Sequence, residues 1–318
     1  YKGLDRVALD SAHAGDIVAV AGIVKGTVAD TICAPEVDVK DYIKAQPIDP
    51  PTLAMTFSVN DSPLAGKEGD KVTSRVIWAR LEKEAEGNIA LKISRTDNSD
   101  TFEVAGRGEL QLGVLIETMR REGFELSISR PRVIMKRDEN GQLLEPVEEV
   151  VVDVDEEFSG AVVEKLSKRR AELVEMIPSQ VGNKVRLIFH APSRGLIGYH
   201  SEFLTDTRGT GVMNRIFYAF EPYKGEIEDR RNGVMISSEN GQAIAYSLWK
   251  LQDRGPMFVE HNSPVYVGMI IGEHTKYNDI EVNPTKSKQL TNIRAAGKDE
   301  AIDLIPPRKM SLEQALAY

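Results

Sequence analysis

Basic residues gather in one short segment of an otherwise acidic chain. The seventeen residues from Val282 to Lys298 contain no Asp or Glu but carry Lys286, Lys288, Arg294 and Lys298. The whole chain has 40 Lys and Arg against 49 Asp and Glu, which gives a formal net charge of −9. Such a chain has no general attraction for a polyanion, so local cations must supply any attraction through phosphate contacts and counterion release. The segment is therefore a candidate nucleic-acid contact, although a solvated loop could have the same composition.

Further cations accompany glycines near the middle of the chain. Arg194-Gly-Leu-Ile-Gly198 is similar to the Gly-x-x-Gly loop with which some RNA-binding modules clamp a nucleic-acid backbone. Arg208-Gly-Thr-Gly211 adds a flexible basic turn. One predicted helix is strongly cationic through Lys165, Lys168, Arg169 and Arg170. A helix start and a solvated helix face would explain the same residues without RNA.

Two more glycines lie in Gly106-Arg-Gly-Glu-Leu110, between a predicted strand and a predicted helix. The exposed N–H groups of a helix N-terminus attract anions, so the turn could hold a phosphate. A tight turn between strand and helix also explains both glycines, and we favour that interpretation.

The motifs of nucleotide-hydrolysing enzymes are not found. A P-loop needs a glycine-rich turn that ends in Lys-Ser or Lys-Thr, and neither Gly66-Lys-Glu68 nor Lys25-Gly-Thr27 fits. The guanine-reading pattern Asn-Lys-x-Asp also fails, because Arg186 stands where Asp is required after Asn183-Lys184. This chain is therefore not expected to be an enzyme or to bind GTP or ATP by these means.

Metal and catalytic sites are not indicated either. The five histidines show no i,i+4 pair and no partnering Cys, so we expect no metal site. The carboxylates from Asp153 to Glu157 lie between a predicted strand and helix, where they complement the helix dipole. We predict no catalytic residue. An unrecognised enzyme site around Cys33 or these carboxylates is the alternative.

Length and composition indicate an ordinary globular chain. Its 318 residues suggest two to three domains, and its 41% hydrophobic content is enough for packed cores. No apolar run approaches the ~18 residues that span a bilayer. The single Cys33 permits no internal disulfide, which fits a cytoplasmic protein. Tyr1 in place of Met is what a domain fragment would show.

Hydrophobic periodicity predicts two consecutive units of one architecture. Short β-segments such as Ile17–Val20 occupy residues 1–45, and a proline-rich linker follows at residues 46–51. The order strand, helix, strand, strand, helix, strand then occurs over residues 46–135 and again over residues 143–222. We predict an α+β protein with two tandem ferredoxin-like βαββαβ sandwiches. Residues 223–318 read as a β-rich terminal domain with short strands, including one at residues 243–251.

Finer predictions concern the helices. For the helix at residues 71–86 we place Val72, Val76, Ala79 and Leu81 on one face, and for the helix at residues 109–121 we place Leu110, Val114, Leu115 and Met119 inward. We expect a helix over residues 158–173. Ser311 and Gln314 form a capping-box pattern for a short final helix.

Particular stretches resemble translational GTPases of the elongation factor G class. Val104–Phe124 resembles domain III of that class, residues 143–199 are similar to domain V, and residues 14–33 are similar to the end of the domain II barrel. Only about ten residues separate Arg132 from Leu143, where elongation factor G has an inserted domain. The ending, Lys286–Glu300 with Pro306–Gln314, resembles the C-terminal domain of the BipA/TypA family.

The resemblance implies the ribosome-binding part of a GTPase that acts in large-subunit assembly and in stress or virulence responses. Its partners would be rRNA, the tRNA acceptor end and ribosomal proteins in the factor-binding or A-site region, with no membrane and a monomeric state. GTP and Mg²⁺ would bind in a domain outside this chain, and no cofactor is expected here. By position, residues 276–298 would be the loop that approaches the peptidyl-transferase centre.

These implications define the domains and the contacts. The domains are a barrel remnant at 1–45, a domain III-like sandwich at 46–135, a domain V-like sandwich at 143–222 and the terminal domain at 223–318. The predicted RNA contacts are Lys276, Lys286, Lys288, Arg294, Lys298, Arg194, Arg208, Lys168, Arg169 and Arg170. The alternatives are a fragment similar to the back-translocation factor LepA, or a protein–protein scaffold without direct RNA contact.

Overall fold

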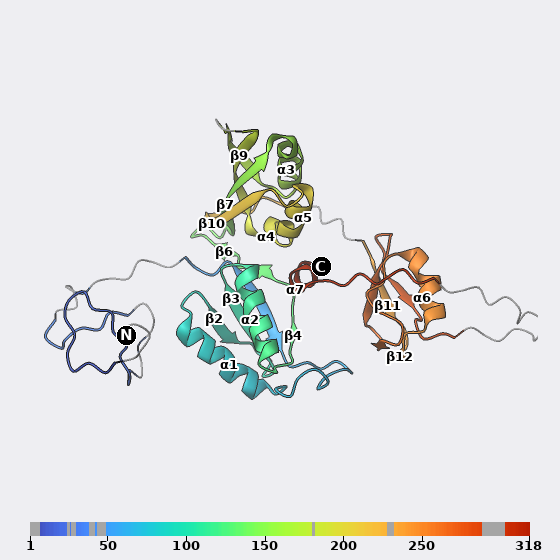
Figure 1. Ribbon diagram of the computed structural model, residues 1–318, viewed down its shortest axis with the longest axis horizontal. Helices are drawn as coiled ribbons and strands as arrows, with labels where there is room; N and C mark the ends of the chain where they lie inside the picture. The colour runs from blue at the N-terminus through green and yellow to red at the C-terminus, as the bar shows by residue number, and fades with distance from the viewer. Residues whose placement is uncertain are drawn as a thin grey trace, which may run out of the picture.

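The computed structural model describes residues 7–23, 26, 30–37, 42, 49–179, 182–227, 232–287 and 303–318. Within these residues, buried hydrophobic side chains form three separate clusters. The clusters belong to three folded parts of the ribbon (Figure 1). We call residues 49–133 the first unit, residues 136–227 the second unit, and residues 232–287 with 303–310 the third unit. The chain is a mixture of helices and sheets, as predicted.

The first unit has two helices and an antiparallel sheet with strand order β2-β3-β1-β4, in which β5 also pairs with β1. Its elements are β1 (Leu53–Ser58), α1 (Ser74–Gly87), β2 (Lys92–Arg95), β3 (Thr101–Gly106), α2 (Glu109–Arg121), β4 (Ser127–Ile128) and β5 (Arg132–Val133). The last strand of the order predicted over residues 46–135 is therefore split into β4 and β5. The Ser129 hydroxyl accepts the Thr56 N–H at 2.8 Å, and Pro131 has no N–H to donate to a ladder.

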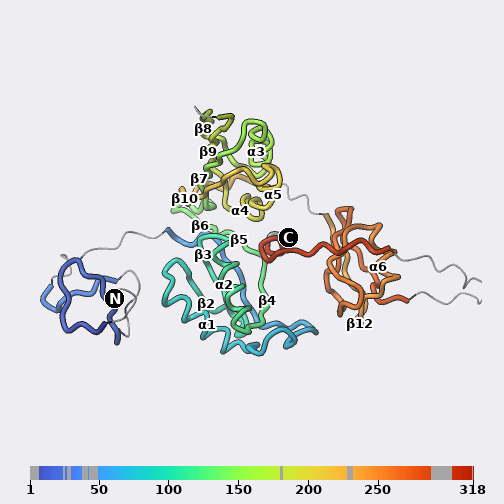
Figure 2. Tube along the Cα trace, in the orientation of Figure 1, coloured from blue at the N-terminus to red at the C-terminus, as the bar shows by residue number. Residues whose placement is uncertain are grey.

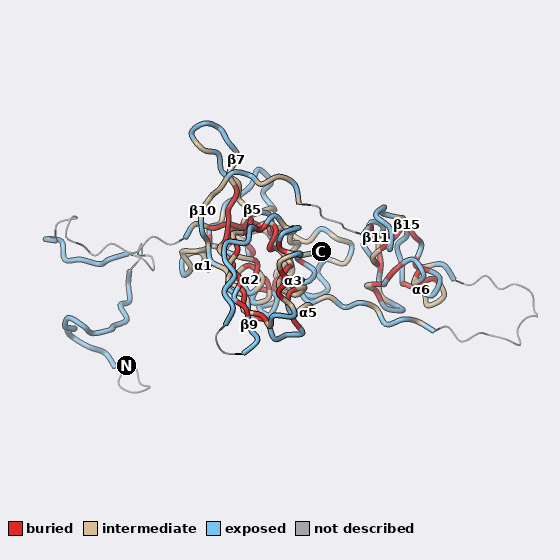
Figure 3. Tube along the Cα trace, turned by 90° about the horizontal axis from the view of Figure 1, so that it is seen from above, coloured by how far each residue is buried: buried red, intermediate tan, exposed pale blue. Residues whose placement is uncertain are grey.

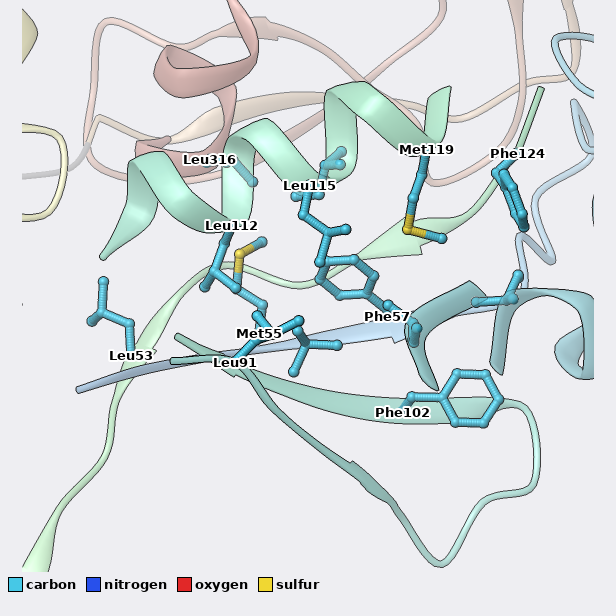
Figure 4. Close-up of a cluster of buried hydrophobic side chains, with 14 residues drawn as sticks. Leu53, Met55, Phe57, Leu91, Phe102, Leu112, Leu115, Met119, Phe124 and Leu316 are labelled. Carbon is cyan, nitrogen blue, oxygen red and sulfur yellow. The ribbon is translucent and has the colours of Figure 1, made fainter. Parts of the chain in front are cut away.

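The core of the first unit lies between this sheet and both helices (Figure 4). On α2, the buried residues Leu112, Leu115, Ile116 and Met119 share one face. The predicted inward residues Leu110 and Val114 are instead exposed, as is Val76 on α1, where Ile77 and Leu81 are buried. Both faces of α2 carry apolar residues, so periodicity alone could not tell which of them meets the sheet.

The second unit has the antiparallel strand order β10-β7-β9-β8. Its elements are β6 (Lys136–Arg137), β7 (Leu143–Asp155), α3 (Glu156–Lys168), β8 (Glu172–Pro178), β9 (Lys184–Pro192), α4 (Ser193–Leu196), α5 (Tyr199–Asp206) and β10 (Val212–Pro222). Helix α3 begins and ends earlier than predicted. Arg170 has φ +65°, and the Ala171 N–H returns to the Leu166 carbonyl at 3.0 Å, so the helix closes before β8 begins.

The third unit contains a three-stranded sheet of order β14-β11-β15 and a two-stranded β12-β13 ladder. Its elements are β11 (Val234–Ser237), β12 (Gly241–Gln242), α6 (Ala245–Leu251), a 3₁₀ turn (Gln252–Arg254), β13 (Pro264–Val265), β14 (Ile270–Glu273) and β15 (Ile280–Val282). The strand predicted over residues 243–251 is wrong, because α6 forms there. Helical spacing buries Ser247, Leu248 and Leu251 on one face.

The last helix, α7 (Leu312–Ala317), returns to the first unit (Figure 2). Leu316 is buried in the core cluster of the first unit, against α2 (Figure 4). The predicted capping box is confirmed, since the Gln314 N–H donates to the Ser311 hydroxyl and the Ser311 N–H to the Gln314 side chain. The tail thereby connects the third unit to the first.

The N-terminal β-segment predicted at Ile17–Val20 does not form. The described residues between 7 and 37 contain turns but no strand, and all of them are exposed (Figure 3). Isolated short strands bury too little apolar surface to be stable. No helix in the described part of the chain is long and apolar enough to cross a membrane.

Candidate nucleic-acid interface

The beginning of the basic segment is fixed to the third unit. After β15, the Asn283 side chain accepts hydrogen bonds from the N–H and hydroxyl of Thr285, both at 2.9 Å. The Ser247 hydroxyl on α6 donates to the Lys286 carbonyl at 2.8 Å, and Lys286 is exposed. The segment therefore leaves the unit with its first lysine accessible. The predicted contacts Lys288, Arg294 and Lys298 lie outside the described residues.

Lys276 is exposed but is not brought beside Lys286. Its carbonyl accepts the Gly233 N–H at 2.7 Å, just before β11 begins. Strands β11 and β15 pair in parallel, and Lys286 follows the end of β15. The two lysines therefore lie at opposite ends of this strand pair.

The cationic end of α3 is largely neutralised by carboxylates. Lys165 Nζ contacts Glu202 at 2.7 Å and Asp206 at 2.8 Å, and Lys168 pairs with Glu164 at 2.5 Å. Burial opposes the charge of Lys165, but the hydrogen bonds that it donates to both carboxylates outweigh burial and raise its pKa. Part of this cluster is therefore an ordinary ion-paired helix face.

Two predicted cations sit on turns of the second unit. Arg170 donates from Nε to the Glu226 carbonyl at 3.0 Å. Arg208 has φ +50°, is exposed, and places its guanidinium 5.5 Å from the Phe158 ring centroid. Arg208 is therefore accessible to a partner, whereas Arg170 is engaged with the chain that follows β10.

Four arginines line one cavity where the first and second units meet. The predicted contacts Arg169 and Arg194 share it with Arg130 and Arg132 of the first unit. We call this cavity, of about 490 Å³, the arginine pocket. Its remaining lining is Pro131, Val133, Gly195, Ile197, Gly198 and Ile227. No Asp or Glu is among these described lining residues.

Carboxylates hold two of these arginines in place, and one of them, Glu145, is buried. Arg194 forks onto Glu145, whose side chain is fully buried, and also donates to the Gly225 carbonyl. The Arg194 guanidinium lies 4.5 Å from the Tyr223 ring centroid. Arg169 donates to the Gly195 carbonyl at 2.9 Å and to Glu202 at 2.7 Å. The geometry of both guanidinium groups is thus set before any ligand arrives.

Sequence reasoning missed Arg130 and Arg132. Both are exposed and flank the buried Pro131 immediately before β5, and Arg132 forms an ion pair with Glu103. The pattern Arg-Pro-Arg before a strand was a visible signal. What it could not reveal is that β5 lies against α4, more than sixty residues away in sequence.

The Gly-x-x-Gly motif serves the fold directly. A Cβ on Gly195 would lie 2.5 Å from the Arg169 carbonyl oxygen, so only glycine permits this close approach. Gly198 has φ +72°, and its N–H donates to Glu109 of α2 at 3.1 Å. Both glycines thus have structural roles, and both also line the arginine pocket.

The other glycine turn and the carboxylate cluster are also satisfied internally. The Arg107 N–H in the turn before α2 donates to the Gln111 side chain at 2.8 Å, which supports the tight-turn interpretation. Asp153 pairs with Arg186 at 2.8 Å, and the hydrogen bond from Arg186 lowers the pKa of that carboxyl. Among the described residues, no group of three or more His, Cys, Asp and Glu side chains could hold a metal ion.

Comparison with known families matches the last two units. The model of the elongation factor G C-terminus matches residues 142–231, and that of the TypA/BipA C-terminal domain matches residues 232–318. A solved structure described as ttk003000868 from Thermus thermophilus aligns with 60% of this chain and 44% of its own, at TM-score 0.37 and 13% identity.

Curated relatives match along the entire chain. The protein named large ribosomal subunit assembly factor BipA is 49% identical in Salmonella typhimurium and 48% identical in Bacillus subtilis, each over 319 aligned residues that cover 100% of this chain. The alignment covers 52% of each relative, so the chain spans about half the length of the curated relatives it matches. With these matches and the two domain matches, the chain belongs to the BipA/TypA family.

Proposed function

We propose that this chain is the ribosome-binding part of a BipA-type translational GTPase that acts in assembly of the large ribosomal subunit. The observation that carries the proposal is the 48–49% identity, along the entire chain, to relatives named large ribosomal subunit assembly factor BipA. The match of residues 232–318 to the TypA/BipA C-terminal domain favours this assignment over the LepA-like alternative.

In this proposal the chain positions a factor and performs no chemistry itself. It docks in the factor-binding and A-site region of the ribosome, in the cytoplasm and as a monomer, and contributes to stress or virulence responses. GTP and Mg²⁺ bind outside the residues of this chain. The exposed Lys276, Lys286 and Arg208, together with the arginine pocket, supply phosphate contacts to rRNA and to the tRNA acceptor end.

We also propose that the first two units are ferredoxin-like sandwiches equivalent to domains III and V of elongation factor G. Both have the element order βαββαβ when α4 and α5 count as one helical segment, and both place the first and third strands at the centre of the sheet. We keep the predicted boundaries 46–135, 143–222 and 223–318, with residues 1–45 as the end of a barrel.

A protein–protein role is the second candidate, and one observation favours it. Among the described strands, β8 is an edge strand that pairs only with β9, and its apolar residues Leu173, Val174, Met176 and Ile177 are all exposed. An exposed apolar edge can accept a strand from another protein. In that case ribosomal proteins would hold the chain and the basic segment would be idle.

Sedimentation with purified large ribosomal subunits separates these candidates. A variant with Lys286, Lys288, Arg294 and Lys298 all changed to Ala keeps the Lys286 backbone carbonyl that anchors the segment to α6. We expect this variant to co-sediment much more weakly than the wild-type chain, because four phosphate contacts are lost. Undiminished binding would favour the scaffold. Deletion of residues 276–298 is a poorer test, since it removes β15 from the sheet of the third unit.

A further inference from the structure

We propose that the arginine pocket binds one nucleotide unit, with its phosphate on the guanidinium groups and its sugar and base against Pro131, Ile197 and Ile227. The unit is either part of a single-stranded RNA or a free nucleotide, since both present the same chemistry. The choice of RNA as the source rests on the proposed ribosome-binding function. The binding of a nucleotide as such rests on the geometry of the pocket alone.

Among the described residues, the side chains that line the pocket carry positive charges but no negative ones. Arg130, Arg132, Arg169 and Arg194 all line it, and no acidic residue does so among the described lining residues. The carboxylates that pair with these arginines, such as Glu145 and Glu202, are not part of the lining. These ion pairs offset the repulsion between the arginines, while the described lining residues themselves present only positive charge to an entering ligand.

Guanidinium donors remain for a ligand. Arg194 uses Nε and Nη2 for Glu145 and Gly225, and its Nη1 has no hydrogen bond to any described residue. Arg169 uses Nη1 and Nη2, and its Nε likewise has none within the part of the chain that the structure describes. Planar guanidinium groups match phosphate oxygens in a bidentate manner and are less strongly hydrated than ammonium groups.

The size and apolar lining of the pocket indicate more than a bare phosphate. Its volume of about 490 Å³ falls within the roughly 300–1,000 Å³ that is typical of small-molecule sites. Pro131, Val133, Ile197 and Ile227 give it an apolar side, which an inorganic anion would leave uncovered. A nucleotide satisfies both parts, because the sugar and base offer apolar surface and the phosphate offers charge.

The pocket is preformed by contacts within the second unit and between the first and second units. Gly195 lies in close contact with the Arg169 backbone, and Gly198 is hydrogen-bonded to Glu109 across the boundary. Ile197 packs against the hydrophobic core of the first unit. Binding therefore does not have to order the arginines first, which lowers its entropic cost.

Calorimetric titration of the 318-residue chain with uridine 5′-monophosphate and with tetrauridylate tests the proposal. We expect saturable binding to the wild-type chain. Arg132→Gln should weaken it about tenfold, the loss of one charge-assisted hydrogen bond. Ile227→Glu should abolish it by placing an anion in the lining while keeping all four arginines.

Arg186→Gln is the matched control. Arg186 has a single carboxylate partner and a side chain 54% exposed, compared with 63% for Arg132, but it lies on β9 outside the pocket. It should leave both affinities unchanged. Thermal unfolding of each variant shows whether it folds. The titrations of the wild-type chain test the proposal even if a variant does not fold.

Each outcome has a defined meaning. Tighter binding of tetrauridylate identifies an RNA strand as the source, and equal or tighter binding of the monophosphate identifies a free nucleotide. The proposal is overturned if neither probe binds saturably. It is also overturned if Arg186→Gln loses as much affinity as Arg132→Gln. No ribosome is present in the titration, so a negative titration does not contradict ribosome binding. Equally, a negative sedimentation result does not contradict nucleotide binding in the pocket.

Discussion

Glu109 Oε2 accepts a hydrogen bond from the backbone N–H of Gly198 at 3.1 Å, which joins α2 of the first unit to the start of α5 in the second. The other oxygen of Glu109 lies 3.4 Å from Arg215 Nη1, and Arg215 is held from its own unit by Glu148 at 2.9 Å. Glu109 is only 8% exposed. One carboxylate thus fixes two units against each other beside the arginine pocket.

Replacing this carboxylate should loosen the boundary between the units. Glu109→Ala leaves the Gly198 N–H without its acceptor, and an unsatisfied buried polar group costs about 1–3 kcal/mol. We expect that loss in the free energy of unfolding measured with urea. Glu82→Ala, an exposed position on α1, is the control and should change little. Equal stabilities for the two variants would contradict the role given to Glu109.

The Arg194–Glu145 pair should be far more important to stability than a surface pair. Arg194→Ala leaves the fully buried Glu145 without its cation, which costs about 3–5 kcal/mol for a buried pair. Arg186→Ala breaks an exposed pair with Asp153 and should cost at most about 1 kcal/mol. Chemical denaturation of both variants gives the comparison. A similar small loss in both would show that Glu145 finds other partners.

Acid should weaken the second unit partly through Glu202. Burial opposes its ionisation, but hydrogen bonds from Lys165 and Arg169 prevail and lower its pKa below the ordinary 4.5. The unfolded chain therefore binds this proton more readily, so the stabilisation is complete above pH 4.5 and is lost as pH falls through the folded pKa. Melting temperatures across this range should fall less steeply for Glu202→Gln than for the wild-type chain. Parallel curves would rule out this contribution.

The capping box should determine how firmly α7 docks on the first unit. Ser311→Ala removes the N-cap acceptor and should cost about 1 kcal/mol, which raises the opening of the helix roughly fivefold. Hydrogen exchange of the α7 amides measures this opening. Ser311→Asp retains an acceptor and should exchange like the wild-type chain. Equal exchange in Ser311→Ala would show that Leu316 alone holds the helix.

Much of the element order could be predicted because local chemistry specified it. Helix α2 was predicted at its observed bounds, and Ser311 with Gln314 identified the final cap three residues apart. The buried face of α2 was predicted incorrectly. Leu110 and Leu112 are both apolar, and only packing against the sheet determines which of them is buried. Helix α6 was missed because its seven residues are too few for a clear helical period.

The candidate site could be predicted only in part, for the same reason. Arg169 and Arg194 stood out in the sequence through their local basic setting. Arg130 and Arg132 could be assigned to the pocket only from the contact between β5 and α4. No local sequence pattern encodes a contact between such distant segments. The pairing of Lys165 and Lys168 with carboxylates was likewise invisible, and it removes much of the apparent charge of α3.

The salt dependence of binding to large ribosomal subunits tests the central claim most directly. For the wild-type chain, the logarithm of the association constant should fall linearly and steeply with the logarithm of the KCl concentration. Lys286→Ala should reduce the slope by about one phosphate contact, whereas Lys83→Ala on α1 should leave it unchanged. A flat salt response of the wild-type chain, or an unchanged slope for Lys286→Ala, would contradict the account.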